Sequence, residues 1–288
     1  CTYQSSTLIS EAQGDSQIDL IICDEAHRCT GLATSSFTKV LDNNIIKSKK
    51  RLFTTATPRI FSSLVKTIAS QKGDEIYGMD DEVIYGPEFF NYTFGQAIEE
   101  GWLTDYQVVI VVVDEPMVKQ FIDNRKLIAL SSDKYEDAET LASKISVAKA
   151  IKDFDLKRII SFHSRVKEAK NFSTDFLEIL ELLNKKNRPK GTIWTDFVSG
   201  QMSTKDRRLK LKQLKALSSS DRGMVSNARC LSEGVDVPAL DGVVFIDPKG
   251  SQIDIIQSVG RALRKSEEKE KGTIVLPVFI KPGQDEET

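Results

Sequence analysis

The sequence of 288 residues lacks a long apolar run, a strong net charge and any cysteine spacing suited to a metal. No stretch approaches the ~20 apolar residues of a membrane helix, so we expect neither a transmembrane segment nor a signal peptide. The net charge of −2 argues against a protein that coats nucleic acid indiscriminately. Cys1, Cys23, Cys29 and Cys230 are not paired like metal ligands, which predicts reduced, buried thiols in a cytosolic protein. The helical HExxH pattern of a zinc protease is also absent.

The composition is that of a globular protein with a substantial core. Hydrophobic residues make up 40% and charged residues 28%, and the length favours two domains, or one and a fraction. Charge is spread unevenly, because residues 184–216 carry ten Lys or Arg and two Asp, a local charge of +8. A second basic cluster consists of Lys47, Lys49, Lys50 and Arg51. Such patches are usually solvated faces, although binding to a phosphate backbone also requires them.

An apolar run over residues 20–23 ends abruptly in Asp24 and Glu25, with His27 two residues further on. A continuous apolar run is typical of a strand buried on both faces of a parallel sheet, and ligands collect at the carboxyl ends of such strands. Phosphoryl transfer needs a carboxylate that holds Mg²⁺ and a neighbour that orients the attacking water. The two acids therefore form a candidate Walker B site, although acids after a strand are more often an exposed junction.

Strands and helices alternate through most of the chain. Before residue 104 we expect a strand at residues 18–23, a helix near residues 34–42 and a strand at residues 51–55. Later strands are expected at residues 108–113, 158–162, 192–195, 223–226, 242–246 and 273–279. Helices are expected over residues 137–154, after His163, from the capping box of Ser203 and Asp206, and over residues 251–265. Repeated βα units of this kind imply a mostly parallel, three-layer α/β/α fold.

The helix expected over residues 251–265 carries a second candidate site. At 100° per residue it presents two stripes, which are Gln257, Arg261 and Arg264 on one side and Ile256, Val259 and Leu263 on the other. The apolar stripe would pack and the polar stripe would point outward. Arginines on an exposed helix usually only solvate it. Arginines aimed at a γ-phosphate instead stabilise the transition state, and such a finger is worth ~10³ to 10⁵ in rate.

Four short motifs carry a resemblance to superfamily 2 helicases and translocases. They are DEAH at residues 24–27, TAT at 55–57, GVDVP at 234–238 and QSVGRALR at 257–264, in the order and approximate spacing of motifs II, III, V and VI. Longer strings, such as DEAHRCTG and FGQAIEEGWLTDY, resemble the motor of type ISP restriction-modification enzymes and of type I and type III restriction-subunit helicases. The resemblance covers nearly the whole chain. It implies part of a first RecA-like, ATP-binding domain over residues 1–103 and a complete second RecA-like, helicase C-terminal domain over residues 104–288.

The resemblance also implies roles around ATP and Mg²⁺. Asp24 would hold Mg²⁺, Glu25 would activate water, and His27 would couple the nucleotide site to the other motifs. Three further groups would be the motif III pair, the motif V positions that sense nucleotide, and the arginine fingers with their companion: Thr55, Thr57, Gly234, Asp236, Arg261, Arg264 and Gln257. Contacts with nucleic acid would come from the TxQS segment, motif IV and the residues before motif V: Thr2, Tyr3, Gln4, Ser5, His163, Ser164, Arg165 and Arg229. The TxQS and motif IV positions are the least specific, since short polar loops follow strands in any α/β protein.

One family motif is missing. A Walker A loop, GxxxxGK[ST], cradles the phosphates with its amides and lysine, yet no glycine of this sequence is followed by lysine. In the family this loop lies upstream of the TxQS segment, so we expect the chain to begin partway through the first RecA-like domain. We therefore expect further domains upstream in the same polypeptide, and no ATPase activity from these residues alone.

The implied parent is a cytoplasmic, ATP-dependent helicase or translocase that moves on DNA, expected to be double-stranded. One alternative is a non-catalytic nucleic-acid-binding module that keeps the fold, which would leave the four candidate catalytic side chains Asp24, Glu25, Arg261 and Arg264 without a use. The other is an RNA helicase, because both nucleic acids are gripped mainly through phosphates. The longer restriction-type strings favour DNA.

Overall fold

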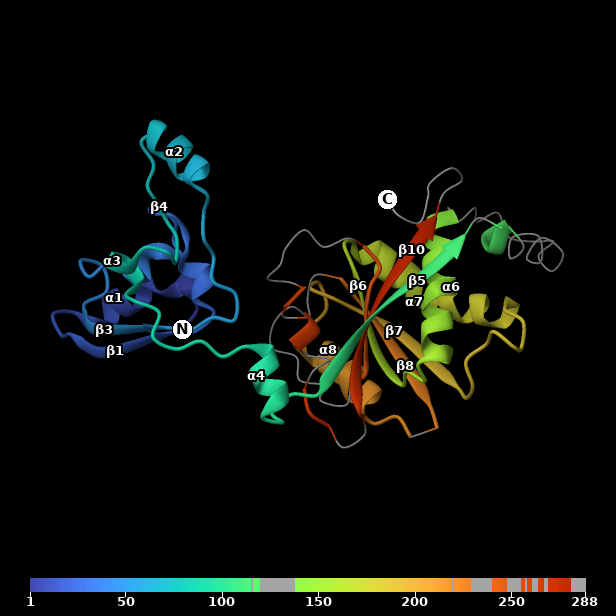
Figure 1. The fold of residues 1–288 in the computed structure, drawn as a ribbon. Coiled ribbons are helices and arrows are strands. Elements are labelled where there is room, and N and C mark those ends of the chain that lie inside the picture. The colour runs from blue at the N-terminus through green and yellow to red at the C-terminus, as the bar shows by residue number, and fades with distance from the viewer. Residues whose placement is uncertain are drawn as a thin grey trace. The chain divides into compact units, whose positions relative to one another are not determined.

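The structure, a computed structural model, divides the chain into two compact units, Cys1–Asn91 and Tyr92–Thr288 (Figure 1). It describes residues 1–114, 116–119, 138–218, 220–228, 240–247, 255–256, 258–260, 264–266 and 269–280. No helix in these ranges is long and apolar enough to cross a membrane. The domain boundary between residues 103 and 104 stays a prediction.

The first unit is built on a small parallel sheet. Its strands β1 (Ile18–Cys23) and β3 (Ser48–Phe53) pair in register, with Cys23 opposite Phe53. A small core of Cys23, Ala26, Cys29, Val40 and Ile46 lies against this pair. The other elements are η1 (Tyr3–Ser5), α1 (Thr7–Gln13), η2 (Ala26–Cys29), β2 (Gly31–Leu32), η3 (Thr38–Leu41), α2 (Ser63–Gln71), β4 (Ile76–Tyr77) and α3 (Glu82–Tyr85). The helix expected near residues 34–42 is thus only the short 3-10 helix η3.

The expectation that β1 is buried on both faces is wrong for this unit. Leu20 is 49% exposed and Ile22 is 63% exposed, whereas Cys23 is 2% exposed. Successive side chains of a strand point to opposite faces, and the small core covers one face of the pair. An unbroken apolar run therefore does not show how many layers cover a strand.

The second unit is the predicted RecA-like α/β/α fold. Its six-stranded parallel sheet has the order β5-β10-β9-β6-β8-β7. The strands are β5 (Asp105–Asp114), β6 (Arg158–His163), β7 (Ile193–Ser199), β8 (Arg222–Ala228), β9 (Gly242–Phe245) and β10 (Lys271–Ile280). The helices are α4 (Phe94–Glu99), α6 (Ala138–Asp153), α7 (Val166–Leu182) and α8 (Thr204–Lys215). Every strand expected after residue 104 is present, and α8 starts at the predicted cap, where Ser203 Oγ accepts from the Asp206 amide at 3.1 Å.

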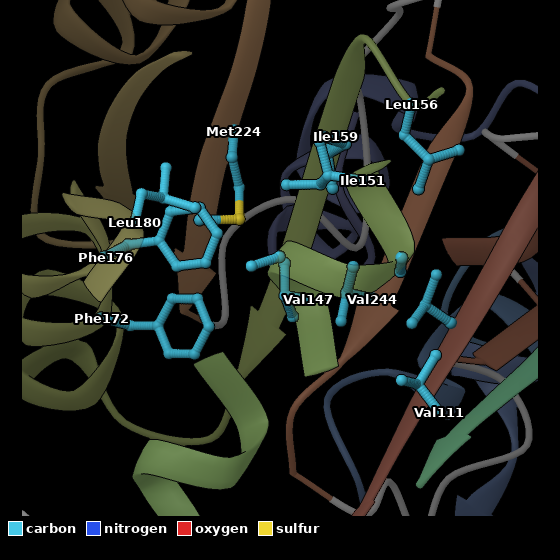
Figure 2. Packing of buried hydrophobic residues seen from close by; sticks show 13 residues of the cluster. Val111, Val147, Ile151, Leu156, Ile159, Phe172, Phe176, Leu180, Met224 and Val244 are labelled. Atoms are coloured by element: carbon cyan, nitrogen blue, oxygen red, sulfur yellow. The ribbon is translucent and has the colours of Figure 1, made fainter. Parts of the chain in front are cut away.

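Apolar side chains fill both sides of this sheet. On one side Phe172 and Phe176 of α7 and Ile151 of α6 pack against the strand residues Ile159 and Met224 (Figure 2). On the other side the core is formed by α8 and by described residues of the expected 251–265 helix, namely Leu214, Ile255 and Val259, over Ile160, Val225 and Val243. Burying one such side chain stabilises the fold by about 1.5–3 kcal/mol. The sheet is therefore a firm base for the loops at its ends.

Candidate active site

Asp24 directly follows β1 and is exposed. Its Oδ1 accepts hydrogen bonds from the amide of Glu25 at 2.9 Å and from the hydroxyl of Thr54 at 3.2 Å. Thr54 is fixed in turn, because its amide donates to the Cys23 carbonyl at 3.0 Å and its carbonyl accepts from the Ala26 amide at 2.9 Å. The pairing of β1 with β3 thus places both strand ends together and orients the carboxylate.

Glu25 combines an unusual backbone with one carboxylate oxygen that receives no hydrogen bond from the described residues. Its φ of 51° and ψ of 47° are left-handed, a conformation that costs a non-glycine residue about 1–3 kcal/mol and clusters at functional sites. Oε2 is buried, and no described residue donates a hydrogen bond to it. Buried polar atoms are nearly always paired. This carboxylate oxygen can therefore accept a hydrogen bond from a ligand or a water molecule.

His27 connects the acids with the TAT segment. Its Nδ1 lies 3.0 Å from Thr55 Oγ1, 3.4 Å from Thr57 Oγ1 and 3.3 Å from Glu25 Oε2. A hydroxyl can accept or donate, so Nδ1 can share a hydrogen bond with Thr55 Oγ1, its nearest neighbour, in either tautomer, while Glu25 Oε2 lies within ion-pair distance. The Thr57 amide also donates to Thr55 Oγ1 at 3.1 Å. Four predicted nucleotide-site residues, Glu25, His27, Thr55 and Thr57, therefore form one connected cluster.

The donor set fits Mg²⁺ brought by a nucleotide. Within the described ranges, no group of three or more His, Cys, Asp or Glu side chains could hold a metal. Mg²⁺ usually keeps its waters and binds through one or two carboxylates together with substrate phosphates. The exposed carboxylate of Asp24 supplies a hard oxygen of that kind. Oδ1 is the oxygen that accepts the two hydrogen bonds described above.

The segment expected to touch nucleic acid begins beneath the acidic site. Tyr3 donates from its hydroxyl to the carbonyl of Asp24 at 2.5 Å, and burial together with a contact to Cys29 raises the Tyr3 pKa far above its usual range. Thr2 and Gln4 are exposed, and the Thr2 hydroxyl donates to Ser5 Oγ at 3.2 Å. Tyr3 therefore supports the acidic loop, while Thr2 and Gln4 present polar groups at the surface.

Two thiols flank the DEAH residues. Cys23 and Cys29 are free and buried, as predicted, whereas Cys1 is exposed and Cys230 lies outside the described residues. The contact with Cys23 and burial together raise the pKa of Cys29 far above its usual range. A thiol of this kind stays protonated and packs as a small apolar group.

In the second unit, His163 ends β6 and is buried. The residue is 5% exposed, its Nε2 lies 3.0 Å from Ser161 Oγ, and its ring centroid lies 4.9 Å from that of Phe172. Burial, helped by the charge of Lys144, lowers the His163 pKa to about 4 despite the opposing effect of Asp247. The imidazole is therefore neutral near pH 7 and faces the interior, not the surface where it was expected to touch nucleic acid.

Ser164 and Arg165, which follow His163, are exposed. The Ser164 amide donates to Asp247 Oδ2 at 2.6 Å, and Arg165 lies 3.5 Å from Glu168. Of the predicted motif IV residues, these two can meet a ligand. Arg264, one of the two predicted arginine fingers, lies within the described residues and is exposed. Five predicted site residues lie outside the described ranges: Arg229, Gly234, Asp236, Gln257 and Arg261.

Sequence reasoning missed two supporting residues. Thr54 holds the Asp24 carboxylate, and Asp247 holds the turn after β6. Their positions were a usable signal, because Thr54 follows β3 and Asp247 lies two residues beyond β9. Both strands neighbour the strand that ends in a site, and polar residues at adjacent carboxyl ends of a parallel sheet meet.

Comparisons with known proteins match both parts of the chain. The model of the helicase conserved C-terminal domain matches residues 143–266, and that of the type III restriction enzyme res subunit matches residues 1–60. A probable helicase of African swine fever virus is 29% identical over 284 residues, which are 97% of this chain and 28% of the viral protein.

Solved structures agree with these matches. The ATP-dependent type ISP restriction-modification enzyme LlaBIII, bound to DNA, matches with a TM-score of 0.81 and 34% identity, over 99% of this chain and 20% of LlaBIII. The chain therefore resembles superfamily 2 helicases and restriction enzymes. A nuclease-deletion mutant of the type ISP enzyme LlaGI, in complex with a DNA substrate mimic, matches this chain with a TM-score of 0.57 and 31% identity. The match covers 97% of the chain and 17% of LlaGI.

Proposed function

We propose that this chain is part of an ATP-dependent translocase or helicase motor that moves on duplex DNA within a restriction-modification enzyme. It supplies the later part of the first motor domain and the whole second domain, with the boundary between residues 103 and 104. The cluster after β1 carries the proposal. There, an exposed Asp24 carboxylate stands beside Glu25, whose buried Oε2 receives no hydrogen bond from the described residues.

The two acids divide the work of ATP hydrolysis. Asp24 would hold Mg²⁺, which would supply positive charge against the phosphates of the nucleotide. Glu25 accepts a proton from the attacking water, and two features support that role: its left-handed backbone and an Oε2 that receives no hydrogen bond from the described residues. Arg264 and Arg261 supply positive charge to the transferred phosphate, in the role of arginine fingers.

His27 transmits the state of the site. Its Nδ1 lies close to Glu25, Thr55 and Thr57. A change in hydrogen bonding at Glu25 would therefore move the imidazole and alter its contacts with the TAT segment. We assign Gln257, Gly234 and Asp236, together with the TAT threonines, to nucleotide sensing, by the resemblance alone.

DNA contacts are assigned to exposed polar groups of both units. Thr2 and Gln4 lie at the surface of the first unit, and Ser164 and Arg165 at that of the second. Tyr3, Ser5 and His163 support these residues, and Arg229 completes the set by the resemblance alone. Phosphate contacts of this kind would make affinity fall steeply with salt.

These 288 residues alone should not hydrolyse ATP, because they contain no Gly-Lys dipeptide and therefore no Walker A loop to bind the phosphates. We place the Walker A loop, and further domains, elsewhere in the same polypeptide. ATP turnover at motor-like rates by the isolated 288 residues would contradict this assignment.

The experiment is DNA-stimulated ATPase of the full-length protein with Asp24→Asn. We expect kcat/KM for Mg-ATP to fall by ~10²- to 10³-fold, the range for losing one preorganised charge-stabilising group. Asp15→Asn, an exposed acid of the same unit, is the matched control and should keep the rate. Duplex DNA should stimulate the unchanged protein more than RNA does. An ATPase rate of Asp24→Asn equal to that of the control would refute the proposal. Stronger stimulation by RNA than by DNA would show that RNA, and not DNA, is the substrate.

A further inference from the structure

We call residues 257–264, which include both predicted arginine fingers, the arginine motif. Residues 93–103 of the second unit contact Gly260 and Arg264 of this motif and Lys265, which follows it. The backbone of Leu103 forms an antiparallel bridge with Arg264. Lys265 Nζ donates a hydrogen bond to the Gly101 carbonyl at 2.9 Å. The ring of Phe94 packs over Gly260, where a Cβ on the glycine would lie 3.7 Å from Phe94 Cζ. We call residues 93–103 the brace.

The brace has a well-defined conformation of its own. Thr93 and Gln96 form a reciprocal capping box at the start of α4. At the other end, the carbonyl of the buried Ala97 accepts the amides of Trp102 at 2.8 Å and Leu103 at 3.0 Å. Gly101 makes this sharp turn with a φ of +74°, which side chains rarely allow. A short helix closed at both ends is a firm surface for other residues to pack on.

The other side of the arginine motif is also fixed. Ser258 is buried, and Val259 packs against the core beneath the sheet. Gly260 then faces Phe94 of the brace, and the Arg264 backbone pairs with Leu103. Arg264 itself is exposed. The Arg264 backbone is held by Leu103 while the residue stays at the surface, which is what a cation aimed at a ligand requires.

We propose that the brace positions Arg264 for its phosphate, and that Phe94 and Lys265 are positioning residues of the ATPase reaction. This inference rests on the proposed function, because it takes Arg264 as the group that meets the transferred phosphate. A guanidinium stabilises the transition state only at the correct distance, and a misplacement of about 1 Å can cost ~10²-fold in rate. The brace limits such displacement through the backbone next to the arginine.

Exposure makes these two residues suitable for a test. Phe94 is 38% exposed and Lys265 is exposed, so their replacement should change the unfolding free energy by under about 1 kcal/mol. A loss of rate would then report on position instead of folding.

The experiment measures steady-state ATPase of the full-length, DNA-bound protein with Lys265→Met and Phe94→Ala. We expect kcat to fall by about tenfold, with little change in KM for ATP or in the melting temperature. Lys265→Arg keeps a donor and should restore most of the rate, as Phe94→Leu should restore packing. Lys152→Met, an exposed lysine of α6, is the matched control.

A double-mutant test separates positioning from general damage. In an Arg264→Ala background, which has no guanidinium to position, Lys265→Met should cause no further loss. Additive losses, or full rates with Lys265→Met and Phe94→Ala, would overturn the brace while Asp24→Asn still upheld the proposed function. An Arg264→Ala protein with an unchanged rate would overturn it too. Full activity of Asp24→Asn would remove both proposals together.

Discussion

Strands β1 and β6 each end in a polar stretch with a histidine, but the two stretches differ in how their polar atoms are satisfied. After β6, His163 is buried and its Nε2 meets Ser161 Oγ at 3.0 Å. After β1, Asp24 is exposed and Glu25 Oε2 is buried without a hydrogen bond from the described residues. The satisfied strand end supports the structure, and the unsatisfied one has groups left for a ligand. Two strand ends with similar sequences can therefore have different roles, one structural and one in ligand binding.

The largest effect should separate the two units by packing. Phe176→Ala removes a fully buried ring from the second unit and should cost about 3–5 kcal/mol of unfolding free energy. Ile22→Ala, on the exposed face of β1, should cost under about 1 kcal/mol. Urea unfolding of the 288-residue chain with each substitution gives both values. A larger cost at Ile22 than at Phe176 would reverse the comparison.

The next effect concerns pH and the buried imidazole. Burial lowers the folded-state pKa of His163 from 6.5 to about 4, so the unfolded chain binds the extra proton first as the pH falls. The stability from the neutral ring is complete above pH 6.5 and is lost between about pH 6.5 and 4. This amounts to roughly 3 kcal/mol at about 1.4 kcal/mol per pKa unit. Urea unfolding at pH 7 and pH 4.5 should show a smaller drop in His163→Gln than in the unchanged protein. Equal drops would place the acid sensitivity elsewhere.

A smaller effect should appear at the TAT segment. Thr55→Val removes the hydroxyl 3.0 Å from His27 Nδ1 at nearly constant volume. We expect kcat of the full-length ATPase to fall by about tenfold, the equivalent of one hydrogen bond, with ATP affinity unchanged. Thr67→Val, in the exposed helix α2, is the matched control. Unchanged turnover in Thr55→Val would separate the TAT segment from hydrolysis.

The regular elements of the second unit could be predicted because their periodicity is strong. The helix expected over residues 137–154 is α6, whose Leu141, Ile145, Ala148 and Ile151 are buried, and β1 has its expected bounds, residues 18–23. Exposure of β1 could not be predicted, because an apolar run does not reveal how many layers cover it. The same limit applied to His163, since a polar loop reads alike whether it faces water or a core.

The chemistry of the β1 end was only partly readable. Asp24, Glu25 and His27 were predicted from their order along the chain, and the structure brings Thr55 and Thr57 to the same histidine. The left-handed backbone of Glu25, and the lack of a hydrogen bond from the described residues to its Oε2, could not be foreseen. The segment around Glu25 is tied to a distant one by the hydrogen bond from the Ala26 amide to the Thr54 carbonyl, and no local pattern encodes such a contact.

The central claim is that Glu25 activates the attacking water, and Glu25→Gln in the full-length protein tests it most directly. ATP affinity and single-turnover hydrolysis are measured together, with Glu11→Gln, an exposed position of α1, as the matched control. We predict ATP binding within about twofold of the unchanged protein and hydrolysis slower by ~10²- to 10⁴-fold, the usual contribution of a general base. Hydrolysis by Glu25→Gln at the rate of the control would contradict the account.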